Sequence, residues 1–369
     1  MTQFSAFDAA MMAKALRLAE QGQFLARPNP RVGCVITHQN TIVGEGYHQC
    51  FGQPHAEVNA LLQAGAAAQG ATAYVTLEPC AHVGKTPPCA QALIDAGVQR
   101  VVCAMRDPNP RVDGGGFQLL QQAGIEVRYG LMASSAAELN RGFIKRMSHG
   151  LPWVRVKLAQ SLDGRTAMAS GESQWITARA ARADVQQLRA RHDAIISGSG
   201  THLADDPSYT VRFSDWLTPP PARVQQQFRQ PLRVVLDRRQ QLNLTSKFFS
   251  IAEPIWWVTQ AQPKTGLPPH VKWQGWDASQ GLLGLLRELA AAECNEVLVE
   301  AGSALAGAFM QQGLVDELIV YQAPKLLGHL AQPLLDWPLT TMAEAHDLRL
   351  LDARAVGRDW RFTFCAHDD

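Results

Sequence analysis

The sequence predicts two α/β domains within one chain. Three observations support this prediction: the length of 369 residues, the alternation of strand-like and helix-like segments, and a basic stretch near the middle that ends in glycine and proline. A length of this order favours two domains, each with its own core. The apolar content of 46% is ordinary for a globular protein. Strands that alternate with helices indicate layered domains with a sheet at the centre.

The first half is expected to form one such domain. Residues 5–21 have the spacing of an amphipathic helix that ends near Gly22. Two extended runs then flank a short His-Gln-Asn-Thr turn, which predicts a hairpin. The expected elements in order are strands Arg31–Thr37 and Ile42–Tyr47, helix 55–68, strand Ala73–Leu77, helix 89–96, strand Arg100–Ala104, helix 115–123 and strand Ile125–Tyr129.

A change of pattern at Asn140–Pro152 marks the junction, and we expect domain 1–148 to end there and domain 149–369 to begin. Residues 214–231 are rich in proline and glutamine, which predicts a surface loop. The expected elements of the second domain are strand Val154–Ala159, helix 177–190, strands Ala194–Ser197, Arg233–Asp237 and Ile255–Val258, helix 282–291, strand Glu296–Glu300, helix 304–312 and strand Glu317–Ala323.

Charge and composition exclude several classes of protein. The formal net charge is +1, so no strongly basic surface indicates a nucleic-acid partner. No apolar run approaches the roughly 20 residues that cross a bilayer, and the N-terminus lacks the features of a signal peptide. Seven cysteines without disulfide-framework spacing suit a reducing compartment. We therefore expect a cytoplasmic protein without nucleic-acid or membrane partners.

One group of residues in the first half predicts chemistry. His55 is followed by Glu57, and Cys80 and Cys89 each follow a proline. One histidine and two cysteines can hold Zn²⁺ with a fourth position open for water. Glu57 is not needed as a ligand and can move protons to and from that water. Zinc nucleobase deaminases use these parts, which predicts hydrolytic deamination.

The spacing of the cysteines departs from the common deaminase pattern, in which two residues separate them. Here eight residues lie between Cys80 and Cys89. Cys89 opens an amphipathic run after two prolines, so it is expected at a helix N-terminus, where a thiolate is favoured. For each residue alone the alternative is a buried histidine or an inert core cysteine. The ordered set favours the metal site.

Several segments resemble one known family. In the first half these are Pro28–Cys34, Gly44–His48 and the insertion Pro79–Cys89, and in the second half Lys157–Arg165, Gly171–Trp175 and Leu203–Arg212. They resemble the bifunctional deaminase-reductases of riboflavin biosynthesis over nearly the whole chain, except residues 214–231 and about the last thirty. The resemblance implies a cytidine-deaminase-like three-layer domain that binds Zn²⁺, followed by a dihydrofolate-reductase-like domain that uses NADPH.

The resemblance also implies a substrate pocket around the zinc site. The positions that match the family's pyrimidine pocket are Asn29, His48, His82 and Lys85. Lys85, inside the insertion between the cysteines, suits the substrate phosphate. For His48 and His82 taken alone, a surface histidine is the alternative.

A second site is expected where a strand, a small-residue turn and a helix follow one another in Val299–Phe309. Such a turn can present backbone N–H groups to a phosphate, although Gly302 and Gly307 do not form the dinucleotide-binding fingerprint. Helix packing is the alternative for this glycine pair. The resemblance implies cofactor contacts at Ala159, Trp175, Thr201, Asp205, Gly302, Ser303, Ala304, Leu305, Ala306, Gly307 and Ala308. Arg238 could meet the 2′-phosphate of the cofactor, or be a plain exposed arginine.

The remaining expectations concern the reduced substrate. Arg189 and Arg212 suit its phosphate because guanidinium groups bind phosphate in a bidentate manner. Ser173 and Glu300 are candidates to hydrogen-bond its ring, and Tyr209 is expected to contact it through the backbone. Lys157 and Asp205 are expected to assist proton transfer as hydride reaches C1′. These contributions come from the resemblance and the residue types together.

The function expected from these features is a pair of consecutive reactions on small phosphorylated pyrimidines. The first is deamination of 2,5-diamino-6-ribosylamino-4(3H)-pyrimidinone 5′-phosphate, and the second is NADPH-dependent reduction of 5-amino-6-(5-phosphoribosylamino)uracil. A homo-oligomer is also expected. One alternative is a nucleoside or nucleic-acid deaminase with a regulatory domain, which the cysteine spacing and neutral charge disfavour. Another is a binding protein with structural zinc, which the presence of Glu57 disfavours.

Overall fold

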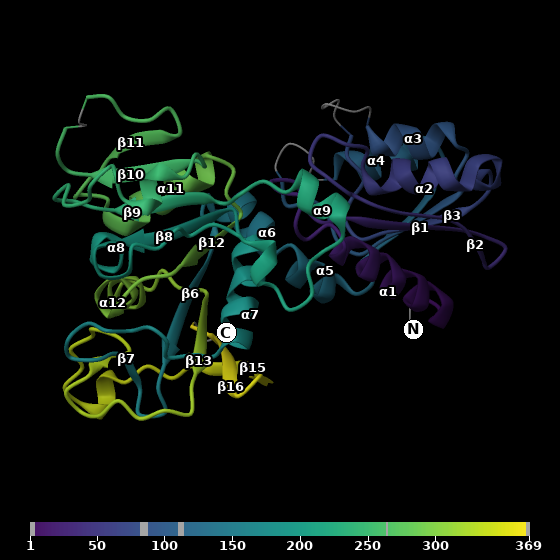
Figure 1. The fold of residues 1–369 in the computed structure, drawn as a ribbon. Helices are drawn as coiled ribbons and strands as arrows, with labels where there is room; N and C mark the ends of the chain where they lie inside the picture. The colour runs from purple at the N-terminus through teal and green to yellow at the C-terminus, as the bar shows by residue number, and fades with distance from the viewer. Residues whose placement is uncertain (1–3, 82–87, 110–113, 263–264, 367–369) are drawn as a thin grey trace. The chain divides into compact units, whose positions relative to one another are not determined.

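The structure is a computed structural model that describes residues 4–81, 88–109, 114–262 and 265–366 (Figure 1). The chain divides into two compact units, Met1–Gly150 and Leu151–Asp369, each built around its own sheet. The division between activities that we expect at residues 148 and 149 stays a prediction. Among the described residues, no helix is long and apolar enough to span a bilayer.

The first unit has three layers. Its five-stranded sheet has the order β2-β1-β3-β4-β5, in which β1 is antiparallel to β2 and β3 while β3, β4 and β5 are parallel. Helices α2, α3 and α4 pack one face through alanine and leucine side chains, and α1 and α5 pack the other (Figure 1). The strands are β1 Gly33–His38, β2 Thr41–Tyr47, β3 Thr72–Val75, β4 Arg100–Cys103 and β5 Glu126–Tyr129. The helices are α1 Ala6–Glu20, α2 Ala56–Ala64, α3 Cys89–Asp95, α4 Gly115–Gln122, α5 Ala133–Leu139 and α6 Arg141–His149, and a 3₁₀ turn η1 spans Gly65–Ala68.

A buried carboxylate ties α1 to the sheet. Asp8 forms a capping box with Ser5, and its Oδ1 accepts hydrogen bonds from the Tyr74 hydroxyl at 2.9 Å and from Nη1 of Arg100 at 2.8 Å. Although partial burial opposes ionisation, the hydrogen bonds from Arg100, Ser5 and Tyr74 hold the pKa of Asp8 well below its usual range. The helix is therefore anchored by a charged group that stays ionised in the folded state.

This anchor predicts a dependence of stability on pH. A carboxyl group whose folded pKa is depressed stabilises the fold above its unfolded pKa, about 3.9, and loses that contribution as pH falls through the folded value. We expect Asp8→Asn to lower the free energy of unfolding by about 1–3 kcal/mol at neutral pH. In urea unfolding at a series of pH values, the difference between wild type and variant should shrink below pH ~4. A difference that stays constant from neutral to acid pH would contradict this role.

The second unit contains a nine-stranded sheet with the order β11-β10-β9-β8-β12-β6-β13-β16-β15. The seven strands from β11 to β13 run parallel, and β16 and β15 are antiparallel at one edge. These strands are β6 Trp153–Gln160, β8 Ala194–Gly198, β9 Leu232–Leu236, β10 Ile255–Thr259, β11 Val271–Gly275, β12 Glu296–Val299, β13 Glu317–Gln322, β15 Arg349–Val356 and β16 Asp359–Cys365. A small separate sheet pairs β7 Arg165–Ala167 with β14 Gln332–Pro333.

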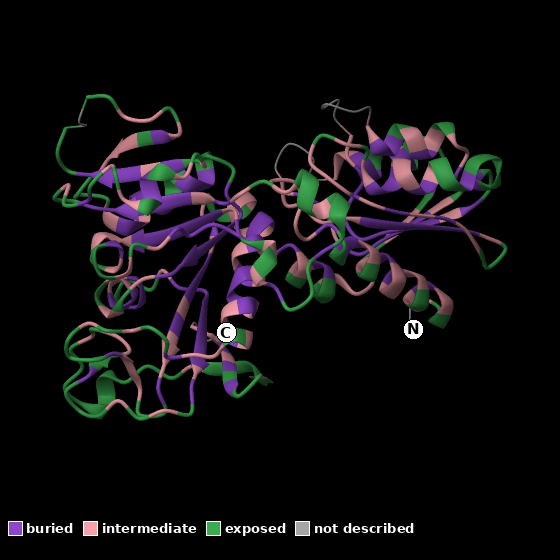
Figure 2. Ribbon diagram, viewed as in Figure 1, coloured by how far each residue is buried: buried purple, intermediate pink, exposed green. Residues whose placement is uncertain are grey.

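Helices cover both faces of the large sheet. Leucines of α11 and Phe309 of α12 pack one face, and α7 together with Phe248 and Phe249 packs the other. Figure 2 shows that the central strands of this sheet are largely buried. The helices are α7 Arg179–Ala190, α8 Ser199–Asp205, α9 Ala222–Gln227, α10 Lys247–Ser250, α11 Gly281–Ala291 and α12 Ser303–Gln311, with 3₁₀ turns η2 Phe213–Asp215 and η3 Met342–Glu344. Strands that are buried on both faces explain why this half reads as continuous apolar runs.

The structure differs from the sequence expectations in several segments. The expected junction contains helix α6, because Phe143 is buried and the Asn140 side chain bonds twice to the Arg31 backbone. Residues 214–231 include the short helix α9, which is largely exposed, rather than loop alone. Strands β11, β15 and β16 were not expected.

Candidate active sites

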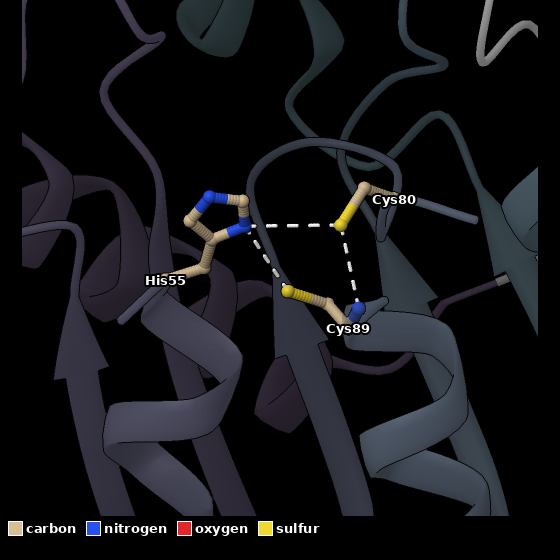
Figure 3. A group of neighbouring side chains, drawn as sticks. All are labelled: His55, Cys80 and Cys89. Atoms are coloured by element: carbon tan, nitrogen blue, oxygen red, sulfur yellow. Dashed lines mark hydrogen bonds between the residues drawn. The ribbon is translucent and has the colours of Figure 1, made fainter. Parts of the chain in front are cut away.

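Three metal-ligand side chains of the first unit meet at the ends of two helices. His55 is the N-cap residue of α2, Cys89 is the first residue of α3, and Cys80 lies in the segment after β3 (Figure 3). Close packing of α2 on β2 sets the position of His55. A Cβ atom at Gly46 would lie 2.4 Å from the carbonyl oxygen of Ala56, so only glycine permits this approach.

The geometry of these atoms fits a zinc ion. Nδ1 of His55 lies 3.2 Å from Sγ of Cys89 and 3.7 Å from Sγ of Cys80, and all three ligand atoms lie within 4.8 Å of one another (Figure 3). Tetrahedral zinc with ordinary Zn–N and Zn–S bonds places its ligand atoms about 3.5–3.8 Å apart. The expected set of His55, Cys80 and Cys89 is thus brought together with spacing and chemistry that suit zinc.

The protonation states of these three ligand groups depend on one another. The hydrogen bond from Cys89, supported by His55 and by the Cys89 backbone N–H, lowers the pKa of the Cys80 thiol to about 4. The hydrogen bond with Cys80 and burial raise the pKa of Cys89. Hydrogen bonding to Cys80 raises the pKa of His55. A zinc ion would displace the protons of the cysteine thiols and of a protonated His55, because thiolate and neutral imidazole are the binding forms.

Glu57 lies in the first turn of α2 and is buried. Burial, and then the neighbouring Cys80 charge, raise the pKa of its carboxyl group to about 7, and the positive charge of a zinc ion would oppose this rise. It does not belong to the three-residue ligand group. A buried carboxyl group outside the ligand set can accept and return a proton.

His48 and Asn29 extend the site. The His48 ring packs edge-on against the His55 ring at 5.2 Å between centroids, and its Nε2 lies 3.2 Å from Nδ2 of Asn29. Nδ1 lies 3.3 Å from the Pro54 carbonyl oxygen, so that nitrogen donates and Nε2 accepts from Asn29. Burial lowers the pKa of His48 to about 4, which keeps it neutral. His48 is therefore no surface histidine. His82 and Lys85 lie outside the described residues.

The second unit contains a cavity of about 1220 Å³ at the carboxyl ends of its parallel strands. Most of the expected reductase residues line it: Lys157, Ala159, Ser173, Trp175, Arg189, Thr201, Asp205, Tyr209, Arg212, Glu300, Gly302, Ser303, Ala304 and Leu305. The structure does not bring Arg238 there, since this residue is exposed and lies outside the cavity wall. That favours the alternative of a plain surface arginine.

Glu300 is the centre of a buried charged group in this wall. Arg189 donates to its two carboxylate oxygens at 2.5 and 3.0 Å, and Nζ of Lys157 lies 3.7 Å away. Burial opposes ionisation of Glu300, but these two cations lower its pKa overall, while burial lowers the pKa of Lys157. This pairing makes the expected phosphate contact of Arg189 less favoured, because its guanidinium already binds both carboxylate oxygens of Glu300.

The side chain of Tyr209 matters more than we expected. Its hydroxyl donates to the Glu300 carbonyl oxygen at 3.0 Å and lies 2.9 Å from Oγ of Ser197, and the residue is buried. The Arg189 guanidinium lies over its ring at 5.2 Å. Tyr209 therefore connects β8 to the end of β12 through its hydroxyl, and its ring packs against the guanidinium of Arg189, which is paired with Glu300.

Asp205 ends α8, and its oxygens accept from Oγ of Ser173 at 3.2 and 3.3 Å. The next residue, Asp206, points elsewhere: its Oδ2 accepts from the backbone N–H of Lys247 at 3.2 Å, at the start of α10. At the cavity wall Trp175 is 60% exposed and its ring is covered by the Arg182 guanidinium at 4.4 Å. A cavity wall that contains both an exposed indole and a carboxylate suits a flat, polar ligand such as a nicotinamide cofactor.

The N-terminus of α12 fits a phosphate group. Gly302 is its N-cap and has no side-chain cap, and its own N–H donates to Oγ1 of Thr201 at 3.2 Å. Gly302 and Ala304 are exposed in the cavity wall, so first-turn N–H groups can meet an anion. Ala306 and Gly307 are instead buried, and a Cβ at Gly307 would lie 2.4 Å from the Asp336 carbonyl oxygen. Ala306, Gly307 and Ala308 are not among the residues that line the cavity, and Ala308 packs against the core, so the expected cofactor contacts at these three positions stay predictions.

Sequence reasoning missed one face of α7. Four long polar residues on it line the cavity, namely Arg179, Arg182, Gln186 and Arg189, of which only the last was expected. Their spacing of three and four residues places them on one helical face. In the sequence, a row of polar residues along one face of a helix whose other face is apolar could have indicated that this face lines a site.

Comparison with known proteins agrees with both sites. Residues 5–105 match the family model of the cytidine and deoxycytidylate deaminase zinc-binding region, and residues 152–362 match that of the RibD C-terminal domain. The riboflavin biosynthesis protein RibD of Escherichia coli (strain K12) is 51% identical over 357 residues, which cover 95% of this chain and 97% of that protein. The RibD protein of Haemophilus influenzae is 48% identical over 372 residues, with 99% of each chain covered.

Solved structures give the same result. RibD of Acinetobacter baumannii, form 1, superposes with a TM-score of 0.92 at 47% identity and covers 97% of this chain and 98% of its own. The diaminohydroxyphosphoribosylaminopyrimidine deaminase/5-amino-6-(5-phosphoribosylamino)uracil reductase of Thermotoga maritima superposes with a TM-score of 0.86 at 31% identity and covers 97% and 98%. The cytidine-deaminase-like and dihydrofolate-reductase-like architectures expected from the sequence are confirmed. The chain belongs to the RibD family of riboflavin biosynthesis proteins.

Proposed function

We propose that the chain carries out two consecutive reactions on one pyrimidine. The first unit deaminates 2,5-diamino-6-ribosylamino-4(3H)-pyrimidinone 5′-phosphate, and the second reduces the resulting 5-amino-6-(5-phosphoribosylamino)uracil with NADPH. The observation that carries the proposal is the pairing, in one RibD-family chain, of the His55–Cys80–Cys89 group beside a buried Glu57 with the cavity around Glu300 and Asp205.

In the deaminase reaction, zinc held by His55, Cys80 and Cys89 would make a water molecule more acidic. Glu57 accepts a proton from the attacking water and delivers it to the departing amino group. Water adds to the ring carbon, the C–N bond breaks, ammonia leaves and a carbonyl group remains. His48 stays neutral and, with Asn29, offers hydrogen-bonding groups at the edge of the site.

In the reductase reaction, NADPH would supply a hydride to C1′ of the opened sugar. The α12 N-terminus is suited to hold a cofactor phosphate, and Trp175 and Asp205 lie where they can contact its nicotinamide riboside. Lys157 is the candidate proton donor, because burial lowers its pKa and Glu300 keeps it in place. Arg212 is the freer of the two expected phosphate contacts, because it pairs with the exposed Asp215 rather than with a buried acid.

The partners follow from this chemistry. Both substrates are small phosphorylated pyrimidines, and nucleic acid is not expected to bind. We further propose that the protein works in the cytoplasm as a homo-oligomer. The formal net charge of +1 supports the expectation that nucleic acid does not bind.

A coupled assay tests the proposed function. The zinc-loaded protein, given the diaminopyrimidine phosphate, should release ammonia, and NADPH added afterwards should be oxidised. The deaminated compound supplied directly should be reduced without prior ammonia release, because reduction needs only the second unit. Deamination of cytidine or transfer RNA, with no turnover of the pyrimidine phosphate, would instead favour the alternative of a nucleoside or nucleic-acid deaminase.

A further inference from the structure

A buried carboxylate close to the zinc ligands has no part in the proposed chemistry. Glu78 lies two residues before Cys80 and is only 3% exposed. Its two oxygens accept hydrogen bonds from four backbone N–H groups, two of which belong to the first turn of α4, where donors lack partners within the helix. The donors are Asp107 and Gly114, each 3.2 Å from Oε2, and Gly116 and Phe117, which lie 3.0 and 3.2 Å from Oε1.

These four hydrogen bonds require a carboxylate. Each oxygen of Glu78 accepts from two N–H groups, and a carboxylate offers about four such acceptor positions. A glutamine side chain has the same shape but only one acceptor oxygen, so its amide nitrogen would face two backbone donors. A carboxylate also suits the N-terminus of α4 because of the helix dipole, and the N-cap residue Gly114 supplies no side-chain cap of its own. Glu78 therefore joins the start of α4 to the segment that leads to Cys80.

The start of α4 packs directly on that segment. A Cβ atom at Gly116 would lie 1.9 Å from the Pro79 carbonyl oxygen, so only glycine permits this approach. The backbone N–H of Glu78 donates to the Met105 carbonyl oxygen at 3.0 Å. The two residues before Cys80 are thus held against the start of α4 and against the segment after β4.

Cys80 is the metal ligand that most needs this support. His55 and Cys89 lie at the starts of α2 and α3, whereas Cys80 lies in a segment without helix or strand. On the side of α3, the Cys89 N–H donates to Sγ of Cys80 at 3.3 Å, and the Ala90 N–H donates to the Cys80 carbonyl oxygen at 3.1 Å. The start of α3 and, through Glu78, the start of α4 therefore set the position of the Cys80 sulfur.

We propose that Glu78 is a positioning residue for the metal centre. Because it joins the start of α4 to the residues before Cys80, its carboxylate holds Sγ of Cys80 where zinc can bind it together with His55 and Cys89. The inference rests on the zinc site of the proposed function and not on the identity of the substrate. Glu78 acts through Cys80, and the proton transfer stays with Glu57. Loss of the groups that hold metal ligands in place typically lowers metal affinity about 10–100-fold.

Glu78→Gln tests the proposal, with Asp8→Asn as the matched control. Competition with a chelator measures the zinc affinity of the full-length protein, and the absorption spectrum of the Co²⁺-loaded protein reports the geometry of the two thiolates. Glu78→Gln should weaken zinc binding about 10–100-fold and change the cobalt spectrum. Asp8 is also a buried carboxylate at the start of a helix of this unit, but α1 packs the other face of the sheet. Asp8→Asn should therefore lower stability and leave both metal readouts as in wild type.

The outcomes decide the role of Glu78 whichever substrate the enzyme takes. A folded Glu78→Gln variant with the zinc affinity and cobalt spectrum of wild type would overturn the positioning role. Equal losses of zinc affinity in Glu78→Gln and Asp8→Asn would also overturn it, because metal loss would then follow the stability of the unit. If Glu78→Gln does not fold, Glu78→Asp decides, since it keeps a carboxylate that is one methylene shorter. It should bind zinc more weakly than wild type, and unchanged affinity would overturn the proposal. Tight zinc binding by wild type without turnover of the pyrimidine phosphate would count against the proposed function alone.

Discussion

Replacement of Glu57 by glutamine is expected to lower the rate of deamination by about 10²–10⁴-fold while the protein retains its zinc. Glutamine has nearly the same shape and fits the buried position, but it cannot take up or return a proton. Glu57 lies outside the group of three metal ligands, so the metal should stay. Ammonia release and zinc content, measured on the same preparation, give the two readouts.

The controls use the ligand set and the second unit. Cys89→Ser should lose zinc and deamination together, since it removes a ligand at the start of α3. Both variants should still oxidise NADPH when the deaminated compound is supplied, because the described residues that line the reductase cavity all belong to the second unit. Full deamination by Glu57→Gln would exclude the proton-transfer role, and loss of reduction in that variant would place the division between activities elsewhere.

The zinc group could be predicted from sequence because its signal is local. Each ligand lies at or near the start of a helix or next to a proline, and the order of the motif fixes which residues converge. The pairing of His48 with Asn29 needed the resemblance, since a lone histidine near a strand end carries no such signal. Its burial against His55 is a consequence of the tertiary fold.

The reductase cavity was less predictable because its wall is assembled from distant segments. The turn at Gly302 showed its possible phosphate contact in the sequence, whereas the expected contacts at Ala306 and Gly307 came from the resemblance, and these two residues pack inward. Whether a small residue faces a ligand or a neighbouring chain segment depends on rotation of the helix. Strand β15 escaped prediction for a related reason: it is exposed on both faces, so its side chains do not alternate between polar and apolar.

The second large effect is expected at Asp205, with its neighbour Asp206 as the control. Asp205 accepts from Ser173 in the wall of the cavity, which Trp175 also lines. Asp205→Asn keeps the size of the side chain but removes its negative charge and one acceptor. If this carboxylate orients the cofactor or relays a proton, NADPH-dependent reduction should fall by about 10²-fold, as happens when a reacting pair is misplaced.

Asp206→Asn should be mild, because the contact seen for Asp206 is a hydrogen bond from the Lys247 backbone N–H, which an asparagine carbonyl oxygen can also accept. The two variants differ by one position, carry the same chemical change and leave the zinc unit untouched, so zinc content and ammonia release should equal those of wild type in both. Steady-state reduction, with cofactor and substrate varied in turn, shows whether Asp205 affects cofactor binding or the chemical step. Equal and small effects of the two changes would mean that the end of α8 is structural. The proton-transfer role in the reductase would then fall to Lys157 or Glu300, which lie 3.7 Å apart in the wall of the cavity.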